Sequence, residues 1–154
     1  MRRQSRAGEL AWKGFEDLKA WQLAREFMIE CHRLASKLPA QERYDLAPQI
    51  RRSSKSVMAN IAEGYGRYHY LESLRFYYIA RGSLDETINH VIVAHDLAYI
   101  DETRFVELQD LGRRAERTLN GYINYVRKLE TGRDTYGGKY IRSSEGTPEV
   151  LEEE

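Results

Sequence analysis

Proline is rare in this 154-residue sequence, cysteine occurs once, and no apolar run approaches the ~18 residues of a membrane span. The single cysteine, Cys31, excludes an intramolecular disulfide and a metal site built from cysteines alone. It lies on an apolar helical stripe, so a buried, unreactive thiol is expected. Because no apolar signal region is present near the first residues, we expect a cytoplasmic protein with no membrane contact.

An excess of one charge sign is also missing, since 24 Lys and Arg residues balance 24 Asp and Glu residues. Attraction to nucleic acid would therefore depend on local clusters rather than on net charge. The flanks differ from the middle of the chain: residues 1–14 are basic, residues 131–154 close on an acidic run, and neither shows helical periodicity. We expect two flexible arms around one folded domain, residues 15–130.

Helical periodicity dominates the remaining sequence, and no alternating strand pattern of useful length occurs. The predicted helices are Asp17–Leu38, Asp45 to Gly64 or Gly66, Tyr70–Ala98 and Asp101–Leu129. Because the connections are short, consecutive helices should be antiparallel neighbours. The sequence thus predicts an all-α protein, an up-down antiparallel four-helix bundle.

Details within these helices carry further expectations. Asp45 and Asp101 are predicted N-caps, because an aspartate side chain accepts hydrogen bonds from first-turn N–H groups. Leu71 and Tyr78 belong to the apolar stripe of the third helix. Gly82 lies inside that helix at a cost of up to ~1 kcal/mol relative to alanine, which predicts a close helix crossing there.

Motifs for known chemistry are absent. The sequence has no Glu-x-x-His pair of a di-iron bundle, no phosphate-binding glycine loop, no zinc spacing and no nucleophile elbow. We therefore expect a protein that is not an enzyme and needs no cofactor or metal. A weaker alternative is a metal-dependent enzyme using Glu86, His90 and His95, although ordinary surface or hydrogen-bonded side chains explain these residues more simply.

Residues 49–67 form the most distinctive segment, a helix of small residues that begins with Arg51, Arg52 and Lys55. Like charges four residues apart destabilise an isolated helix by a few tenths of a kcal/mol. Carboxylates on another helix or subunit would neutralise them, or an anionic ligand would. Arginines and aromatic residues interleave further along, as in surfaces that bind phosphates and stack on bases. The nucleic-acid-binding candidates are Arg51, Arg52, Lys55, Arg67 and Arg75.

A second set of polar residues suggests a role in folding or assembly. Asn60 and Glu63 stand among small apolar residues and, if buried, would need a partner such as Arg52 or an arginine of the third helix. In the competing interpretation, the arginines pair with carboxylates across a subunit interface. The candidates for this oligomer or core polar network are Asn60, Glu63, Arg81, Asp85 and Glu86.

Three blocks of sequence, residues 15–24, 46–67 and 76–86, together with residues 97–100, resemble a bacterial family. These are the four-helix-bundle proteins encoded in intervening sequences of 23S ribosomal RNA genes, often called S23-type. The resemblance implies a ring-shaped homopentamer. It also implies kinship with accessory variability determinants of diversity-generating retroelements, pentameric bundles that bind nucleic acid and partner a reverse transcriptase. Ser53-Ser54 and Asp45 depart from the family pattern, and residues 131–154 lie outside the resemblance.

The leading hypothesis is a non-enzymatic homo-oligomer that acts as a nucleic-acid-associated accessory or scaffold protein. Its expected partners are other copies of itself, RNA or DNA, and a nucleic-acid enzyme such as a reverse transcriptase. The alternative is a pure protein–protein interaction module without nucleic-acid binding.

Overall fold

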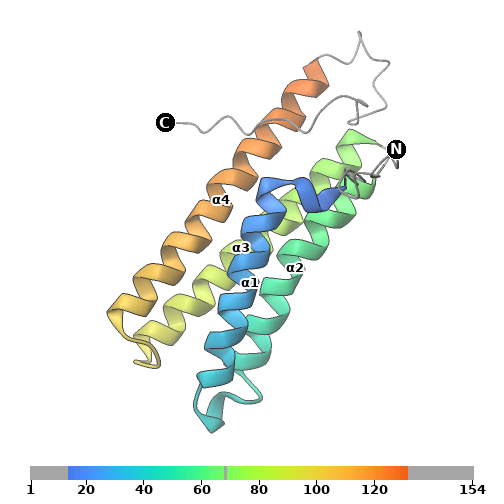
Figure 1. Ribbon diagram of the computed structural model, residues 1–154. Helices are drawn as coiled ribbons and strands as arrows, with labels where there is room; N and C mark the ends of the chain where they lie inside the picture. The colour runs from blue at the N-terminus through green and yellow to red at the C-terminus, as the bar shows by residue number, and fades with distance from the viewer. Residues whose placement is uncertain (1–13, 68, 132–154) are drawn as a thin grey trace, which may run out of the picture.

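The computed structural model describes residues 14–67 and 69–131 and contains four long helices within these ranges (Figure 1). They are α1 (Lys19–Lys37), α2 (Leu46–Gly66), α3 (Tyr70–Asp96) and α4 (Glu102–Thr131), with 3₁₀ turns η1 (Phe15–Asp17) and η2 (Ala40–Glu42). The described ranges hold no strand, which confirms the predicted all-α class. Of the predicted arms, 1–14 and 131–154, residues 1–13 and 132–154 lie outside the described ranges, whereas Thr131 is the last residue of α4 and Gly14 precedes η1.

Each helix packs against two others: α1 against α2 and α4, and α3 against the same two. Side chains from all four helices fill one core between them. The largest fully buried ones include Phe27, Ile50, Tyr77, Leu84 and Leu108. None of the helices in the described ranges has an apolar stretch long enough to cross a bilayer.

One of the two predicted helix caps forms as expected. The Asp101 carboxylate accepts a 2.8 Å hydrogen bond from the backbone N–H of Arg104, so Asp101 caps α4. Asp45 precedes α2 but makes no capping bond, and that prediction was wrong. The Glu42 carboxylate instead accepts from the N–H of Leu46 at 3.1 Å, while that of Asp45 accepts from the Gln49 side chain. A residue in η2 thus takes over the capping role.

The close helix approaches lie at glycines other than Gly82. A Cβ at Gly82 would meet nothing within 4 Å, so the predicted crossing is not found among the residues that the structure describes. A Cβ built at Gly64 would lie only 2.6 Å from Cε1 of Tyr77 on α3. One at Gly112 would lie 3.0 Å from both Phe27 Cζ and Ile88 Cγ1. The absence of a side chain at Gly64 and Gly112 is therefore what lets the neighbouring helices approach.

The serines of α2 join α2 to α3 through buried hydroxyl contacts. The hydroxyl oxygens of Ser53 and Thr87 lie 2.9 Å apart, and those of Ser56 and Ser83 lie at the same separation. Thr87 also donates to the backbone carbonyl of Ser83 at 2.8 Å. Since buried hydroxyl groups are costly without partners, these contacts explain why small polar residues are tolerated in a tightly packed helix.

Cys31 is fully buried, and burial raises the pKa of its thiol to about 12. In the unfolded chain the thiol ionises near pH 8.5. Above that pH only the unfolded state gains from ionisation, so the contribution to stability that is complete below pH 8.5 is lost as the pH rises toward 12. We expect a loss of up to ~1.4 kcal/mol per pH unit, measured by urea denaturation between about pH 8 and 10.5. Cys31→Ala should remove this extra slope. An identical pH dependence in both proteins would contradict the assignment.

Candidate nucleic-acid interface

The three cations at the head of α2 diverge toward different neighbouring helices. Arg51 and Lys55 act on His32 of α1. Burial is the main reason that the pKa of His32 is lowered, and the positive charges of Lys55 and Arg51 lower it further, while a backbone hydrogen bond at Arg51 opposes the change. The charges of Arg51 and Lys55 therefore lie close enough to act together at the contact of α1 with α2.

Arg52 turns to the other side of α2, toward α3. Its Nη2 atom lies 3.9 Å from Oε1 of Glu86, and both side chains are exposed, so this ion pair contributes little to stability. The same Glu86 oxygen lies 3.4 Å from Nε2 of His90. Glu86 therefore binds an arginine and a histidine of its own chain. The interface hypothesis had assigned the pairing with arginine to carboxylates of a second subunit.

Arg67 is also neutralised within the chain. Its guanidinium lies 2.5 Å from the carboxylate of Glu63 and 3.7 Å from that of Glu72, and it stacks over the Phe76 ring at 4.5 Å from the ring centroid. Arg75 is exposed and forms no ion pair within the described part of the chain. The half-buried Arg51 and the exposed Lys55 likewise form no ion pair within the described part of the chain. Of the five sequence candidates, these three are thus the cations without a nearby carboxylate.

Asn60 and Glu63 do not form a buried network with arginines of other helices. The half-buried Asn60 amide donates to the backbone carbonyl of Ser56 at 2.8 Å and to its hydroxyl at 3.0 Å, rather than binding an arginine. Glu63 is exposed, and its partner is Arg67 at the end of the same helix. The expected partner Arg52 reaches neither of them.

Arg81 and Asp85 lie instead between α3 and α4. Arg81 donates to Oδ1 of Asn120 at 3.3 Å, and its guanidinium stacks over Tyr78. The pKa of Asp85 is raised, first by burial and then by the charge of Glu116 and a hydrogen bond with it. The five network candidates therefore do not form one network: Arg81 and Asp85 face α4, whereas the others bind partners elsewhere.

The metal-site alternative also depends on residues that lie apart. His95 Nε2 lies 2.7 Å from the Glu102 carboxylate, and its ring stacks on Phe105 with the centroids 4.0 Å apart. His90 is paired with Glu86 instead. No group of three potential metal ligands forms within residues 14–67 and 69–131. The sequence spacing of Glu86, His90 and His95 thus does not bring them together around one point.

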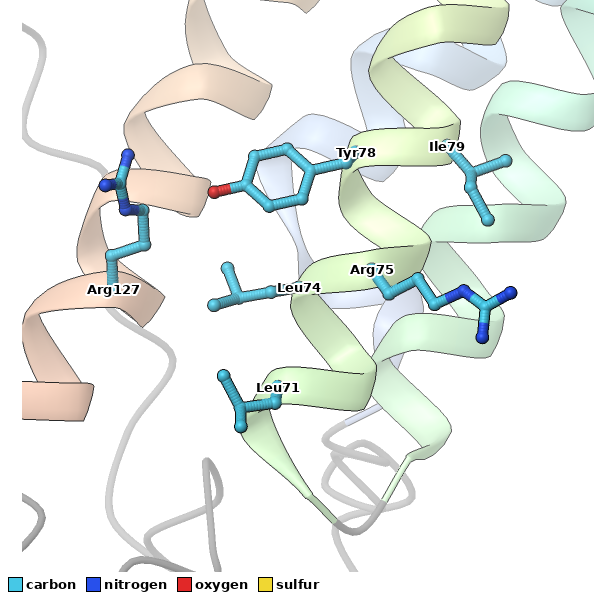
Figure 2. A pocket seen from close by; sticks show the side chains of 6 residues that line it. All are labelled: Leu71, Leu74, Arg75, Tyr78, Ile79 and Arg127. Atoms are coloured by element: carbon cyan, nitrogen blue, oxygen red, sulfur yellow. The ribbon is translucent and has the colours of Figure 1, made fainter.

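A groove on α3 and α4 was not predicted from the sequence. It has a volume of about 610 Å³ and is lined by Leu71, Leu74, Arg75, Tyr78, Ile79 and Arg127. Figure 2 shows Leu71, Leu74 and Tyr78 on the side of α3 nearest Arg127 of α4, with Arg75 and Ile79 on its other side. Leu71, Tyr78 and Ile79 are 60%, 38% and 42% exposed.

The groove arises because the predicted inner face of α3 is confirmed only in part: Leu74, Leu84, Ile88 and Val91 are buried as expected, but two residues near the start of the helix are not. Tyr70 and Tyr77 point into the core, whereas the predicted stripe residues Leu71 and Tyr78 are exposed. The sequence signal for the groove was an excess of apolar residues on α3. Tyr70 with Tyr77 and Leu71 with Tyr78 are both possible apolar stripes, and one stripe is enough to fill the core.

The described architecture is that of an all-α bundle with cations on α2 and α3. Within that class, the model of the 23S rRNA-intervening sequence protein family matches residues 16–121, more than half of the chain. The chain belongs to this family.

A solved structure supports the fold. It is a protein of unknown function from the S23 ribosomal protein family of Bacteroides thetaiotaomicron, with a TM-score of 0.63 and 21% sequence identity. The match covers 68% of this chain and 97% of that one. At this identity the likeness concerns the fold alone. A comparison with functionally curated proteins gives no match.

Proposed function

We propose that this protein is a non-enzymatic, nucleic-acid-associated accessory or scaffold protein of the cytoplasm. In this proposal its helices form an up-down antiparallel bundle that assembles as a homopentameric ring. The observation that carries the proposal is the pair Arg51 and Lys55, which act together on His32 and, like Arg75, form no ion pair within residues 14–67 and 69–131. Phosphate groups are the anionic partners that such cations bind without base specificity.

Assembly would strengthen the weak contacts made by each subunit. A ring repeats the same three cations in every copy, and linked weak sites raise the overall affinity by effective concentration. Surface for self-contact is available at the end of the bundle that holds the α1–α2 and α3–α4 turns (Figure 1). Three large apolar residues are exposed there, Tyr44, Leu97 and Val106. The kinship implied by the sequence extends the proposal to a nucleic-acid enzyme, such as a reverse transcriptase, as a partner.

The test is binding of single-stranded RNA and duplex DNA by fluorescence anisotropy between about 50 and about 200 mM salt. The double variant Arg51→Glu/Lys55→Glu should bind at least about tenfold more weakly at low salt, and its salt dependence should be reduced by the loss of roughly two phosphate contacts. Arg114→Glu/Arg117→Glu is the matched control, because it changes the charge equally at exposed positions of α4.

Two results would overturn the proposal. One is absence of binding to either nucleic acid at low salt. The other is equal weakening by both double variants, which would show that net charge alone matters. Circular dichroism of each variant tests whether the half-buried Arg51 is required for folding, and a loss of binding counts only where the helical spectrum is unchanged.

Light scattering of the same variants addresses the alternative of a pure interaction module. That alternative needs Arg51 and Lys55 to bind carboxylates of a neighbouring subunit. Loss of the oligomer in Arg51→Glu/Lys55→Glu would favour it, whereas an intact oligomer that no longer binds RNA would favour nucleic-acid contact. The in-chain partners of Arg52 and Arg67 already account for two of the five cations without a second subunit.

A further inference from the structure

The groove on α3 and α4 has a chemistry that phosphate binding does not explain. Contacts to a phosphate backbone use cations and hydrogen-bond donors, whereas Leu71 and Ile79 offer only apolar surface. Exposed apolar side chains that cluster in a groove commonly mark an interaction site. Two arginines also line it, Arg127 on α4 opposite Leu71 and Tyr78, and Arg75 on the other side of α3 (Figure 2), and together with the apolar side chains they favour an occupant that is both apolar and acidic.

The chain itself contains a segment with this composition. Residues 149–154 read Glu-Val-Leu-Glu-Glu-Glu, so that two adjacent apolar side chains are flanked by four carboxylates. Val150 and Leu151 supply the apolar side chains that such an occupant needs. The flanking glutamates match the two arginines in charge.

The connecting chain is long enough to bring this segment to the groove. Arg127 lies one helical turn before the end of α4 at Thr131. Residues 132–148 then span up to roughly 55 Å when extended, at about 3.3 Å per residue. That exceeds the length of α4, about 45 Å at 1.5 Å per residue. The segment can therefore reach any point of the groove.

We propose that residues 149–154 bind in this groove, with Val150 and Leu151 against Leu71 and Tyr78, and with glutamates at Arg75 and Arg127. Exposed ion pairs are individually weak. Attachment to the same chain, however, raises the effective concentration of the segment into the millimolar range, where a weak site is occupied. The consequence for nucleic acid rests on the proposed function: the acidic segment would occupy Arg75 and compete with phosphate for it.

The docking is tested by NMR on ¹⁵N-labelled protein, without any nucleic acid. The full chain is compared with a variant that lacks residues 149–154. Amide shifts should change mainly at residues 71–79 and around Arg127, and a synthetic peptide of residues 149–154 should restore them. A peptide with Val150→Ser and Leu151→Ser is the matched control and should not restore them, since it keeps all four carboxylates.

Three outcomes would overturn the docking. Unchanged groove amides in the shortened protein would show that the segment lies elsewhere. Changes centred on His32 and Lys55 would place it on the cations between α1 and α2. If the serine peptide restored the amide shifts equally well, the binding would depend on charge alone and not on Val150 and Leu151. None of these outcomes depends on whether the protein binds RNA or DNA.

The competition is tested separately by anisotropy at low salt. The variant lacking residues 149–154 should bind nucleic acid more tightly than the full chain, by roughly threefold or more. Arg75→Ala should abolish this gain. Full docking by NMR together with unchanged affinity would refute the competition while leaving the docking site intact.

Discussion

Gly64→Val is expected to lower the free energy of unfolding by about 3 kcal/mol. The new Cβ would lie 2.6 Å from Cε1 of Tyr77 and 3.0 Å from Cβ of Phe76, and valine adds two methyl groups beyond it. Tyr77 is 1% exposed, and its ring packs edge to face on Tyr122 with the centroids 5.1 Å apart, so it has little room to move. Helices α2 and α3 must then separate. Urea denaturation at fixed protein concentration measures the loss.

The matched control is Gly82→Val on α3. Gly82 also lies inside a helix, but a Cβ there meets no atom within 4 Å. Valine has a better helix propensity than glycine, so this variant should be neutral or slightly more stable, by a few tenths of a kcal/mol. Similar losses at both positions would show that Gly64 is not a contact point. Adding Tyr77→Leu to Gly64→Val should recover part of the loss, because the shorter side chain makes room.

The existence and limits of the helices could be predicted because local signals define them. Pro39 ends the first predicted helix, and α1 ends two residues earlier, at Lys37. Asp101 caps α4 through its own side chain, a bond that needs only residues three positions apart. Asp45 makes no capping bond because its carboxylate binds the Gln49 side chain, while Glu42, in a turn that the sequence did not predict, accepts from the N–H of Leu46. Local chemistry was sufficient except where two acidic residues competed.

The inner face of the first half of α3 could be predicted only in part, since Leu74 is buried as expected but Leu71 and Tyr78 are exposed. Its first half carries apolar side chains on most of its circumference, so both Leu71 with Tyr78 and Tyr70 with Tyr77 form acceptable stripes. The choice between them depends on α2, where Gly64 leaves room for the Tyr77 ring. The same argument applies to Gly82 and Gly112, since the sequence does not show which glycine meets a neighbouring helix.

In the candidate interface, too, some features follow from local sequence and others only from helix packing. The four-residue spacing of Arg51 and Lys55 places them on one face of α2, and both act on His32. That Arg52 instead reaches Glu86, 34 positions later, follows from the α2–α3 contact and from no local pattern. Sequence spacing identified the cations, but only the packing showed which of them already have carboxylate partners.

The second large effect is expected for Phe27→Ala, a loss of about 4 kcal/mol in the free energy of unfolding. Phe27 on α1 is 1% exposed, and its Cζ atom lies 3.0 Å from the position that a Cβ at Gly112 would take. The ring thus fills the space left open by a glycine on α4. Truncation removes buried apolar surface and leaves a cavity where α1 faces α4. Urea denaturation gives the loss, and an unchanged m-value would show that the native state stays compact.

Gly112→Ala tests whether this ring and this glycine form one contact. In the natural protein the added methyl group would crowd Phe27 and Ile88, so we expect a loss of about 1 kcal/mol or more. In the Phe27→Ala protein the ring is gone, the methyl group fills part of the cavity, and alanine gains up to about 1 kcal/mol of helix propensity over glycine. Gly112→Ala should therefore change from destabilising to stabilising. Directly interacting residues give non-additive changes in the free energy of unfolding. Additive effects of Phe27→Ala and Gly112→Ala would therefore contradict a direct contact between this ring and this glycine.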